Sequence, residues 1–201
     1  MLRVGLTGGI ACGKTVVRRL LADRGAFTID ADAIVHQLMG AGTDLTRRIA
    51  DAFGPDVLSP EEAVDRTKLG RLVFSDPSER SKLNALVHPE VIREEKRLLR
   101  EAEGKGVDVA VVDAALMIEA GTYRDYDRLL VVHCPRALQL DRLAARDGLS
   151  RTEAARRVDA QMPVDEKKPY ADFLIDTSGS LADTERQVQA VWEKLRNDAN
   201  P

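Results

Sequence analysis

A glycine-rich stretch near the amino terminus constrains the fold more than any other feature of the sequence. Residues 8–15 read GGIACGKT and match the pattern G-x-x-x-x-G-K-[ST], with an apolar run at residues 3–7 before them and a helical pattern after them. In this context the backbone N–H groups of the loop and the positive end of the following helix face a bound anion. The stretch therefore predicts a phosphate-binding loop. The alternative is a tight strand-to-helix turn that contains a lysine by chance.

Five short apolar runs predict the strands of one sheet. They are residues 3–7, 26–30, 107–113, 128–134 and 172–176. Each run is almost continuously apolar, which is typical of a strand covered on both faces, and helical patterns fill the intervals. The expected fold class is therefore α/β with a five-stranded parallel sheet. The interval after the second strand is much longer than one crossover requires and predicts a helical insertion. The interval between the fourth and fifth strands, at about residues 135–170, is also longer than a crossover requires, though by less, and it is rich in arginine and lysine.

Capping residues predict several helix ends. Three segments offer an N-cap side chain followed by an acid at the third helical position: SPEE at 59–62, DPSE at 76–79 and SRTE at 150–153. Gly25 and Gly54 follow helical patterns and predict helix ends. His88 is expected to open a further helix.

Composition excludes several classes of protein. Apolar residues make up 44% and charged residues 31% of the chain, and the formal net charge is -3. This describes an ordinary globular protein without the basic excess of a nucleic-acid binder, and no apolar run approaches the roughly 20 residues of a membrane helix. Neither nucleic acid nor membrane is therefore expected as a partner. Cys12 and Cys134 fit no disulfide framework, and the histidines lack metal-ligand spacing, so we expect a reducing, cytoplasmic compartment and no zinc.

The sequence offers three side chains that could hold a triphosphate and its metal ion, those of Lys14, Thr15 and Asp113. Lys14 adds a mobile charge for the β and γ phosphates, and the Thr15 hydroxyl is a ligand for Mg²⁺. Asp113 ends the third predicted strand, where an acid commonly orders Mg²⁺ through its water shell. The alternative for Asp113 is a solvated strand end. A nucleoside triphosphate and Mg²⁺ are therefore expected at this site, and these residues do not distinguish ATP from GTP.

Two acids follow the second predicted strand in the sequence Asp30-Ala31-Asp32. In a parallel sheet this strand end faces the same crevice as the phosphate-binding loop. One of the two carboxylates is expected to cap the next helix. We assign Asp30 to capping and Asp32 to chemistry at an acceptor hydroxyl.

Basic residues of the segment 135–170 predict a lid. Arg142 and Arg146 lie four residues apart, so they share a helix face and can fold over the phosphates. The alternative is a pair of ordinary surface arginines. Lys167 and Lys168 suit an acceptor that carries a pyrophosphate, or they belong to a solvated face.

Other nucleotide-dependent functions are weighed against a small-molecule kinase. A GTPase switch requires a guanine-reading Asn-Lys-x-Asp segment, and the sequence has none. The Asp-x-x-Gly at residues 51–54 ends a helical pattern, where a helix-stop glycine is the simpler interpretation. An ATP-driven motor and a non-catalytic nucleotide-dependent binding module remain alternatives.

The sequence resembles the dephospho-coenzyme A kinase family over almost its whole length. The likeness lies in the segments GLTGGIACGKT, IDADAIVHQL, LNALVHPEV, RLAARDGLSRTEAARRVDAQM and EKKPYADFLIDTSG. The resemblance implies transfer of a phosphoryl group from MgATP to the ribose 3′-hydroxyl of dephospho-coenzyme A, giving coenzyme A and ADP. This is the last step of coenzyme A biosynthesis. A P-loop kinase for another nucleotide or small alcohol is the alternative, and the sequence does not determine the oligomeric state.

The resemblance also implies three parts in a nucleoside-monophosphate-kinase-like fold. These are a nucleotide-binding core at residues 1–32, 106–134 and 171–201, a helical acceptor domain at 33–105 and a lid at 135–170. Catalysis is placed on Asp32, Lys14 and Arg142, and the metal on Thr15 and Asp113. The expected nucleotide contacts are Gly8, Gly9, Ala11, Cys12, Gly13, Lys14, Thr15, Val16, Arg146, Thr177 and Gly179.

Three departures from the family's usual sequence affect these expectations. Residues 115–119 read ALMIE where Pro-Leu-Leu-Phe-Glu is usual, so this turn is expected to be less rigid and the acceptor fit to differ. Cys12 stands where serine is usual, with little expected effect because the loop acts through its backbone. Thr177 stands where asparagine is usual, and contacts to adenine near it are expected to change.

Overall fold

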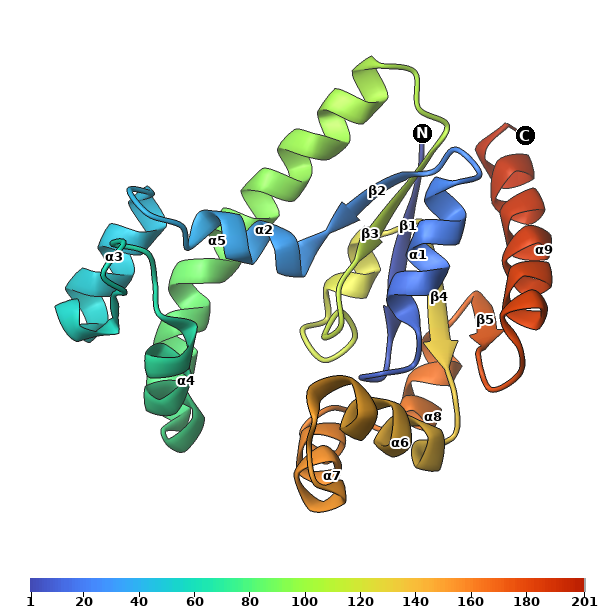
Figure 1. The fold of residues 1–201 in the computed structure, drawn as a ribbon. Helices are drawn as coiled ribbons and strands as arrows, with labels where there is room; N and C mark the ends of the chain where they lie inside the picture. Colours follow the sequence, from blue (N-terminus) through green and yellow to red (C-terminus); the bar gives the residue numbers. More distant parts are fainter. Residues whose placement is uncertain (201) are drawn as a thin grey trace. The chain divides into compact units, whose positions relative to one another are not determined.

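The computed structural model describes residues 1–200, with the side chains of all of them except residues 74 and 75. The chain divides into two compact units, one made of residues 1–29 and 101 onward, the other of residues 30–100. A five-stranded sheet in the order β2-β3-β1-β4-β5 organises the first unit (Figure 1). The strands are β1 (Leu2–Gly8), β2 (Phe27–Asp30), β3 (Val109–Asp113), β4 (Arg128–His133) and β5 (Phe173–Asp176). The five predicted strands and the α/β fold class are confirmed, and β1 pairs in parallel with both β3 and β4.

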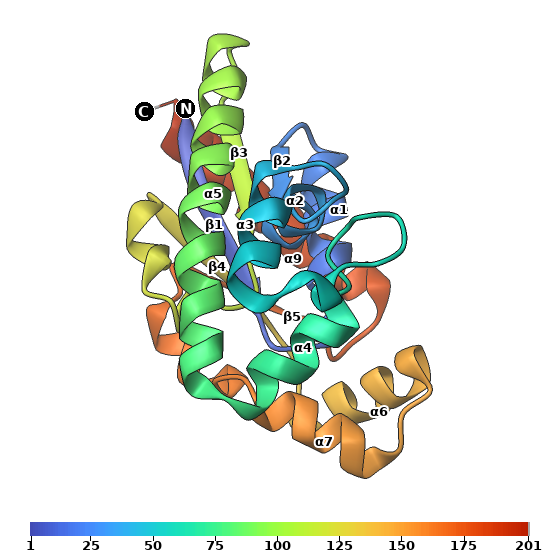
Figure 2. The same cartoon turned by 90° about the vertical axis from the view of Figure 1, so that its left-hand side faces the viewer.

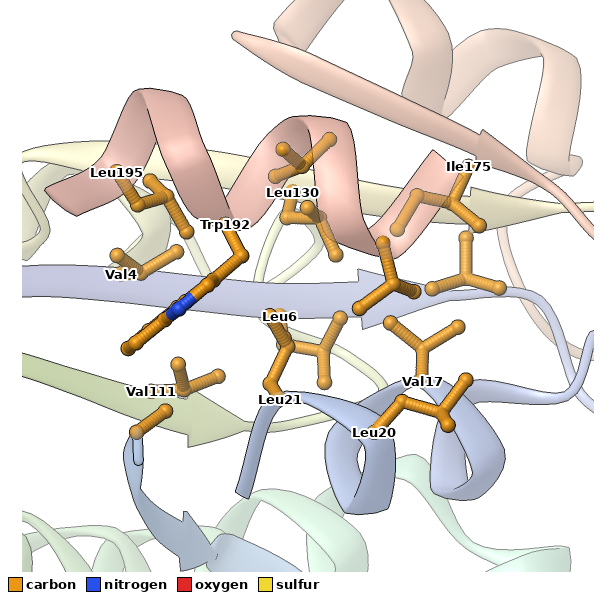
Figure 3. Packing of buried hydrophobic residues seen from close by; sticks show 14 of the residues in the cluster. Val4, Leu6, Val17, Leu20, Leu21, Val111, Leu130, Ile175, Trp192 and Leu195 are labelled. Atoms are coloured by element: carbon orange, nitrogen blue, oxygen red, sulfur yellow. The ribbon is translucent and has the colours of Figure 1, made fainter. Parts of the chain in front are cut away.

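Helices α1 (Lys14–Ala22) and α9 (Leu181–Ala199) cover one face of the sheet. Figure 3 shows their side chains meeting those of β1 and its neighbours. The residues labelled there are Val4, Leu6, Val17, Leu20, Leu21, Val111, Leu130, Ile175, Trp192 and Leu195, all of them buried. Since a fully buried aliphatic side chain contributes roughly 1.5–3 kcal/mol, this cluster fixes β1 and α1, and with them the two ends of the glycine-rich loop.

The turn after β3 packs against the other face of the sheet. Gly5 shows how close the approach is, because a Cβ there would lie 2.6 Å from Sδ of Met117 and 3.2 Å from the ring of Tyr126. Met117 and Ile118 are buried. A short 3-10 turn, η2 (Thr122–Asp125), then leads toward β4.

Two helices of the basic segment lie side by side, α6 (Arg136–Asp147) and α7 (Arg151–Asp159) (Figures 1 and 2). They share a small core of Leu140, Leu143 and Ala154, against which Ile10 of the glycine-rich loop also packs. The predicted cap at 150–153 is confirmed, since Ser150 and Glu153 form a capping box. Helix α8 (Val164–Lys167) and the 3-10 turn η3 (Lys168–Tyr170) then lead to β5.

Residues 30–100 form a helical unit with a core of its own. Its helices are α2 (Ala31–Leu38), α3 (Asp44–Phe53), α4 (Arg66–Ser75) and α5 (Pro77–Gly104), with the 3-10 turn η1 (Pro55–Val57) between α3 and α4. Figure 2 shows α3 and α4 along one side of α5. The predicted helical insertion is confirmed, as is the helix end at Gly54, which has a φ of 90°. None of the helices in the described residues has the length and apolar character that a membrane span requires.

The predicted helix start at residues 59–62 is wrong. An antiparallel bridge joins Leu58 to Val64, so the SPEE segment is the tip of a small hairpin. Helix α4 begins later, where the Asp65 carboxylate accepts hydrogen bonds from the N–H groups of its first turn. Val64 is buried in the helical core, and this burial overrides the local capping signal.

His88 does not open a helix as predicted, because it lies inside α5, and so does Pro89. A proline within a helix removes one hydrogen bond and costs roughly 3 kcal/mol. Burial of Val87 in the core of this unit helps to offset that cost. The start of α5 is as predicted, since the Asp76 carboxylate accepts from the N–H of Ser78 at 2.7 Å.

Candidate active site

The loop between β1 and α1 has the backbone of an anion-binding loop. Ala11 and Gly13 have φ angles of 59° and 81°, in the left-handed region. Gly13 is the N-cap of α1, and no side chain of the described residues caps that end through it. The start of α1 can therefore receive an anion at the positive end of the helix.

Neighbouring atoms lie very close to Gly8 and Gly9, where a larger residue would add a Cβ. The φ angle of Gly8 is not positive, so this glycine is not required for a left-handed backbone angle. A Cβ at Gly8 would lie 2.4 Å from the carbonyl oxygen of Val132, and one at Gly9 would lie 2.3 Å from Nε2 of Gln139. The loop is thus packed closely onto β4 and α6. A side chain at Gly8 would collide with the backbone, and one at Gly9 would have to displace Gln139.

Asp113 lies behind the loop at the end of β3, in register with Leu6 of β1. Its carboxylate forms an ion pair with the Lys14 ammonium and lies 3.4 Å from Nε of Arg18. The alternative of a solvated strand end is wrong, since Asp113 is 2% exposed. The ion pair holds the Lys14 side chain close to the loop.

Thr15 and Asp113 supply oxygen atoms of the type that Mg²⁺ prefers. Thr15 is exposed in the first turn of α1, so its hydroxyl is accessible from solvent. The described residues contain no group of three His, Cys, Asp or Glu side chains that could hold a metal ion. An ion at this site would therefore need phosphate oxygens and water as further ligands. Mg²⁺ is usually bound in that way beside nucleotides, so the donor set fits it.

Arg142 of α6 is joined to the loop through Thr177. Its guanidinium donates to the Thr177 hydroxyl at 3.2 Å and to the Thr177 carbonyl at 2.7 Å. The Thr177 hydroxyl in turn donates to the carbonyl of Cys12 at 2.8 Å. Three segments far apart in the sequence are thereby linked at the loop. Whether Thr177 also contacts adenine stays a prediction.

Arg146, one turn further along α6, has different partners. Its guanidinium donates to the Asp147 carboxylate at 2.7 Å, and Arg157 donates to the same carboxylate at 3.0 Å. These bonds, that from Arg146 above all, hold the pKa of Asp147 below its ordinary value. The contact of Arg146 with phosphate stays a prediction.

Two glutamines hold Ile10 in the loop, and sequence reasoning missed both. Gln161 accepts a hydrogen bond from the Ile10 N–H at 3.0 Å, and Gln139 donates to the Ile10 carbonyl at 2.9 Å. Gln139 is buried. Both come from the segment 135–170, so this segment fixes the loop backbone directly. A polar residue on the buried side of α6 was the only signal available in the sequence.

Lys167 ties α8 to the turn after β3. It is fully buried, and its ammonium donates to the carbonyl of Ala115 at 2.9 Å and to the Glu119 carboxylate at 2.8 Å. The interpretation of Lys167 as part of a solvated face is therefore wrong. The Thr7 hydroxyl also donates to Ala115, at 3.1 Å. These bonds restrain the turn although it lacks the family's usual proline.

Asp30 caps α2 as predicted, with its carboxylate accepting from the N–H of Ala33 at 3.1 Å. Asp32 is exposed in the first turn of the same helix, and its catalytic role stays a prediction. Val16 lies in α1, and Gly179 lies between β5 and α9, where a Cβ would come within 2.9 Å of the Asp183 carboxylate.

Comparisons with known proteins show which family the chain belongs to. The sequence model of the dephospho-CoA kinase family matches residues 2–183. The chain is 44% identical to the dephospho-CoA kinase of Geobacter metallireducens over 201 residues, 100% of both chains. A crystal structure of a Thermus thermophilus protein superposes with a TM-score of 0.82 at 34% identity, covering 96% of this chain and 97% of that one. The dephospho-CoA kinase of Campylobacter jejuni superposes with a TM-score of 0.73 at 27% identity over 98% of both chains. The chain belongs to the dephospho-CoA kinase family.

Proposed function

We propose that the protein transfers the γ-phosphoryl group of ATP to the ribose 3′-hydroxyl of dephospho-coenzyme A, giving coenzyme A and ADP. The observation that carries this proposal is the loop at residues 8–15, in a chain that belongs to this family. Ala11 and Gly13 of the loop have left-handed backbone angles, and no side-chain cap closes the start of α1 that follows them. The acceptor follows from the family, because the relatives are named dephospho-CoA kinases. A kinase for another nucleotide or small alcohol is the alternative.

Lys14 is proposed to hold the β and γ phosphates. In the structure its ammonium pairs with Asp113, which stabilises both charges in a partly buried position. A triphosphate in the loop offers Lys14 a second anion, so the ammonium can bridge to the phosphates without losing a partner. Mg²⁺ on Thr15, with Asp113 nearby, would neutralise charge on the phosphate oxygens.

Asp32 is proposed to orient the 3′-hydroxyl and to accept its proton. Phosphoryl transfer asks little covalent chemistry of the protein, so positioning and charge supply most of the acceleration. We propose that residues 33–105 bind the acceptor and that residues 135–170 act as the lid that brings Arg142 to the phosphates. Closure on the acceptor would suppress transfer to water.

The free thiols of Cys12 and Cys134 support a reducing compartment such as the cytoplasm.

ADP release with a panel of acceptors tests the proposal. We expect turnover with dephospho-coenzyme A and little with other nucleotides or small alcohols. The opposite preference would favour the alternative kinase, and absence of turnover with every acceptor would contradict a catalytic role altogether.

A matched pair of variants tests the role of Asp32. Asp32→Asn should lower kcat by about 10²–10⁴-fold, the usual contribution of a general base, with ATP affinity almost unchanged. Asp30→Asn is the control, because asparagine caps a helix as well as aspartate does. Equal loss of kcat in the two variants would show that this segment matters only for folding.

A further inference from the structure

Cys12 and Cys134, 122 positions apart in the sequence, are brought together beneath the glycine-rich loop. Their Sγ atoms lie 3.5 Å apart, and both residues are buried as free thiols. Cys12 belongs to the loop itself, and Cys134 directly follows β4. The proposed phosphoryl transfer uses neither thiol, so their juxtaposition needs a separate explanation.

The surroundings of Cys134 favour its thiolate. The Cys12 thiol lies within hydrogen-bond distance, and together with the positive charge of Arg142 it lowers the pKa of Cys134 to about 7, against the opposing effect of burial. Pairing with Cys134, together with burial, raises the pKa of Cys12. The two thiols thus differ in acidity, and Cys134 is the more acidic of the pair.

We propose that Cys12 and Cys134 form a modification site for a hydroperoxide, which closes them into a reversible disulfide that disables the phosphate-binding loop. The Cys134 thiolate attacks one peroxide oxygen, the O–O bond breaks, and a sulfenic acid and hydroxide result. The Cys12 sulfur then attacks the sulfenic sulfur, the S–O bond breaks and a second hydroxide leaves. The proton of the Cys12 thiol and one from solvent convert the two hydroxides to water. In total, two thiols and one hydrogen peroxide give one disulfide and two waters.

The disulfide would distort the loop because the sulfur atoms must move. Bond formation shortens their separation from 3.5 Å to about 2.05 Å. Cys12 cannot move alone, since its carbonyl accepts from the Thr177 hydroxyl at 2.8 Å and its N–H donates to Gly9 at 3.1 Å. The displacement therefore reaches the loop amides and the Thr177 hydroxyl to which Arg142 donates. A misplacement of about 1 Å at such a site can lower turnover by about 10²-fold.

The test compares the reduced wild-type chain with Cys134→Ser and Cys134→Ala. Each protein is treated with graded hydrogen peroxide, and three quantities are followed: intact mass, alkylation of free thiols and affinity for a fluorescent ATP analogue. We expect the wild type to lose two hydrogen atoms and both alkylatable thiols, and its nucleotide affinity to fall by about tenfold or more. Dithiothreitol should restore all three. The two variants should bind nucleotide like the reduced wild type and keep that affinity in peroxide.

Three results would overturn the proposal. Two thiols that remain alkylatable in the treated wild type would exclude the disulfide, and a disulfide without loss of affinity would exclude its effect on the loop. Equal loss of affinity in the wild type and both variants would place the damage elsewhere. The effect on affinity rests on the proposed binding of ATP in the loop, whereas the mass measurement does not. A reduced wild type that binds no nucleotide would therefore contradict the proposed function and leave disulfide formation to be decided by mass.

Discussion

Replacing Lys167 with methionine should destabilise the first unit, because this lysine is fully buried and bonded at both ends of the turn after β3. Methionine keeps most of the side chain's length but removes the donors to Ala115 and Glu119. A hydrogen bond to a charged group contributes about 1.5–3 kcal/mol. The Glu119 side chain is 24% exposed, so water replaces part of the lost interaction. We expect a loss of about 2–3 kcal/mol, below the roughly 3–5 kcal/mol for breaking a fully buried pair.

The melting temperature measured by circular dichroism checks this estimate. A chain of this size loses about 2–4 °C per kcal/mol, so the Tm of Lys167→Met should fall by roughly 4–12 °C. Lys168→Met is the matched control, since Lys168 is the next residue and its ion pair with Asp165 is at the surface, where such pairs contribute little. Equal shifts in Tm for the two variants would refute the reasoning, because burial of Lys167 would then have no energetic consequence.

Two further substitutions test how the loop is held. Gly9→Ala should raise the KM for ATP by about tenfold or more, because the added Cβ displaces Gln139 from the Ile10 carbonyl. The control is Gly70→Ala, where the added Cβ meets open space, and this variant should leave the KM unchanged. Thr177→Val should raise the KM for ATP by about fivefold to tenfold, the equivalent of one lost hydrogen bond, since the carbonyl of Cys12 loses its donor. Thr177→Ser keeps the hydroxyl, and failure of serine to preserve the KM would assign the effect to the lost methyl group.

Local sequence patterns were sufficient to predict the strands of the sheet and the position of the phosphate-binding loop. The strands could be predicted because each is a short apolar run covered on both faces, and such runs do not depend on the strand order. Asp30 could be assigned as a cap because capping involves residues only two or three positions apart. The same local rule failed at Ser59, where burial of Val64 in the helical core decided the outcome.

The contacts that hold the loop in place could not be predicted, because they join residues that are far apart in the sequence. Gln139 bonds to Ile10 across 129 positions, and Thr177 bonds to Cys12 across 165. Neither pair follows a helical or strand period, because each depends on how α6 and β5 are arranged around β1 and β4. The motif GGIACGKT therefore specifies which atoms bind phosphate, whereas the rest of the unit determines where those atoms lie. A change in α6 or at Thr177 can consequently weaken nucleotide binding while the motif itself remains intact.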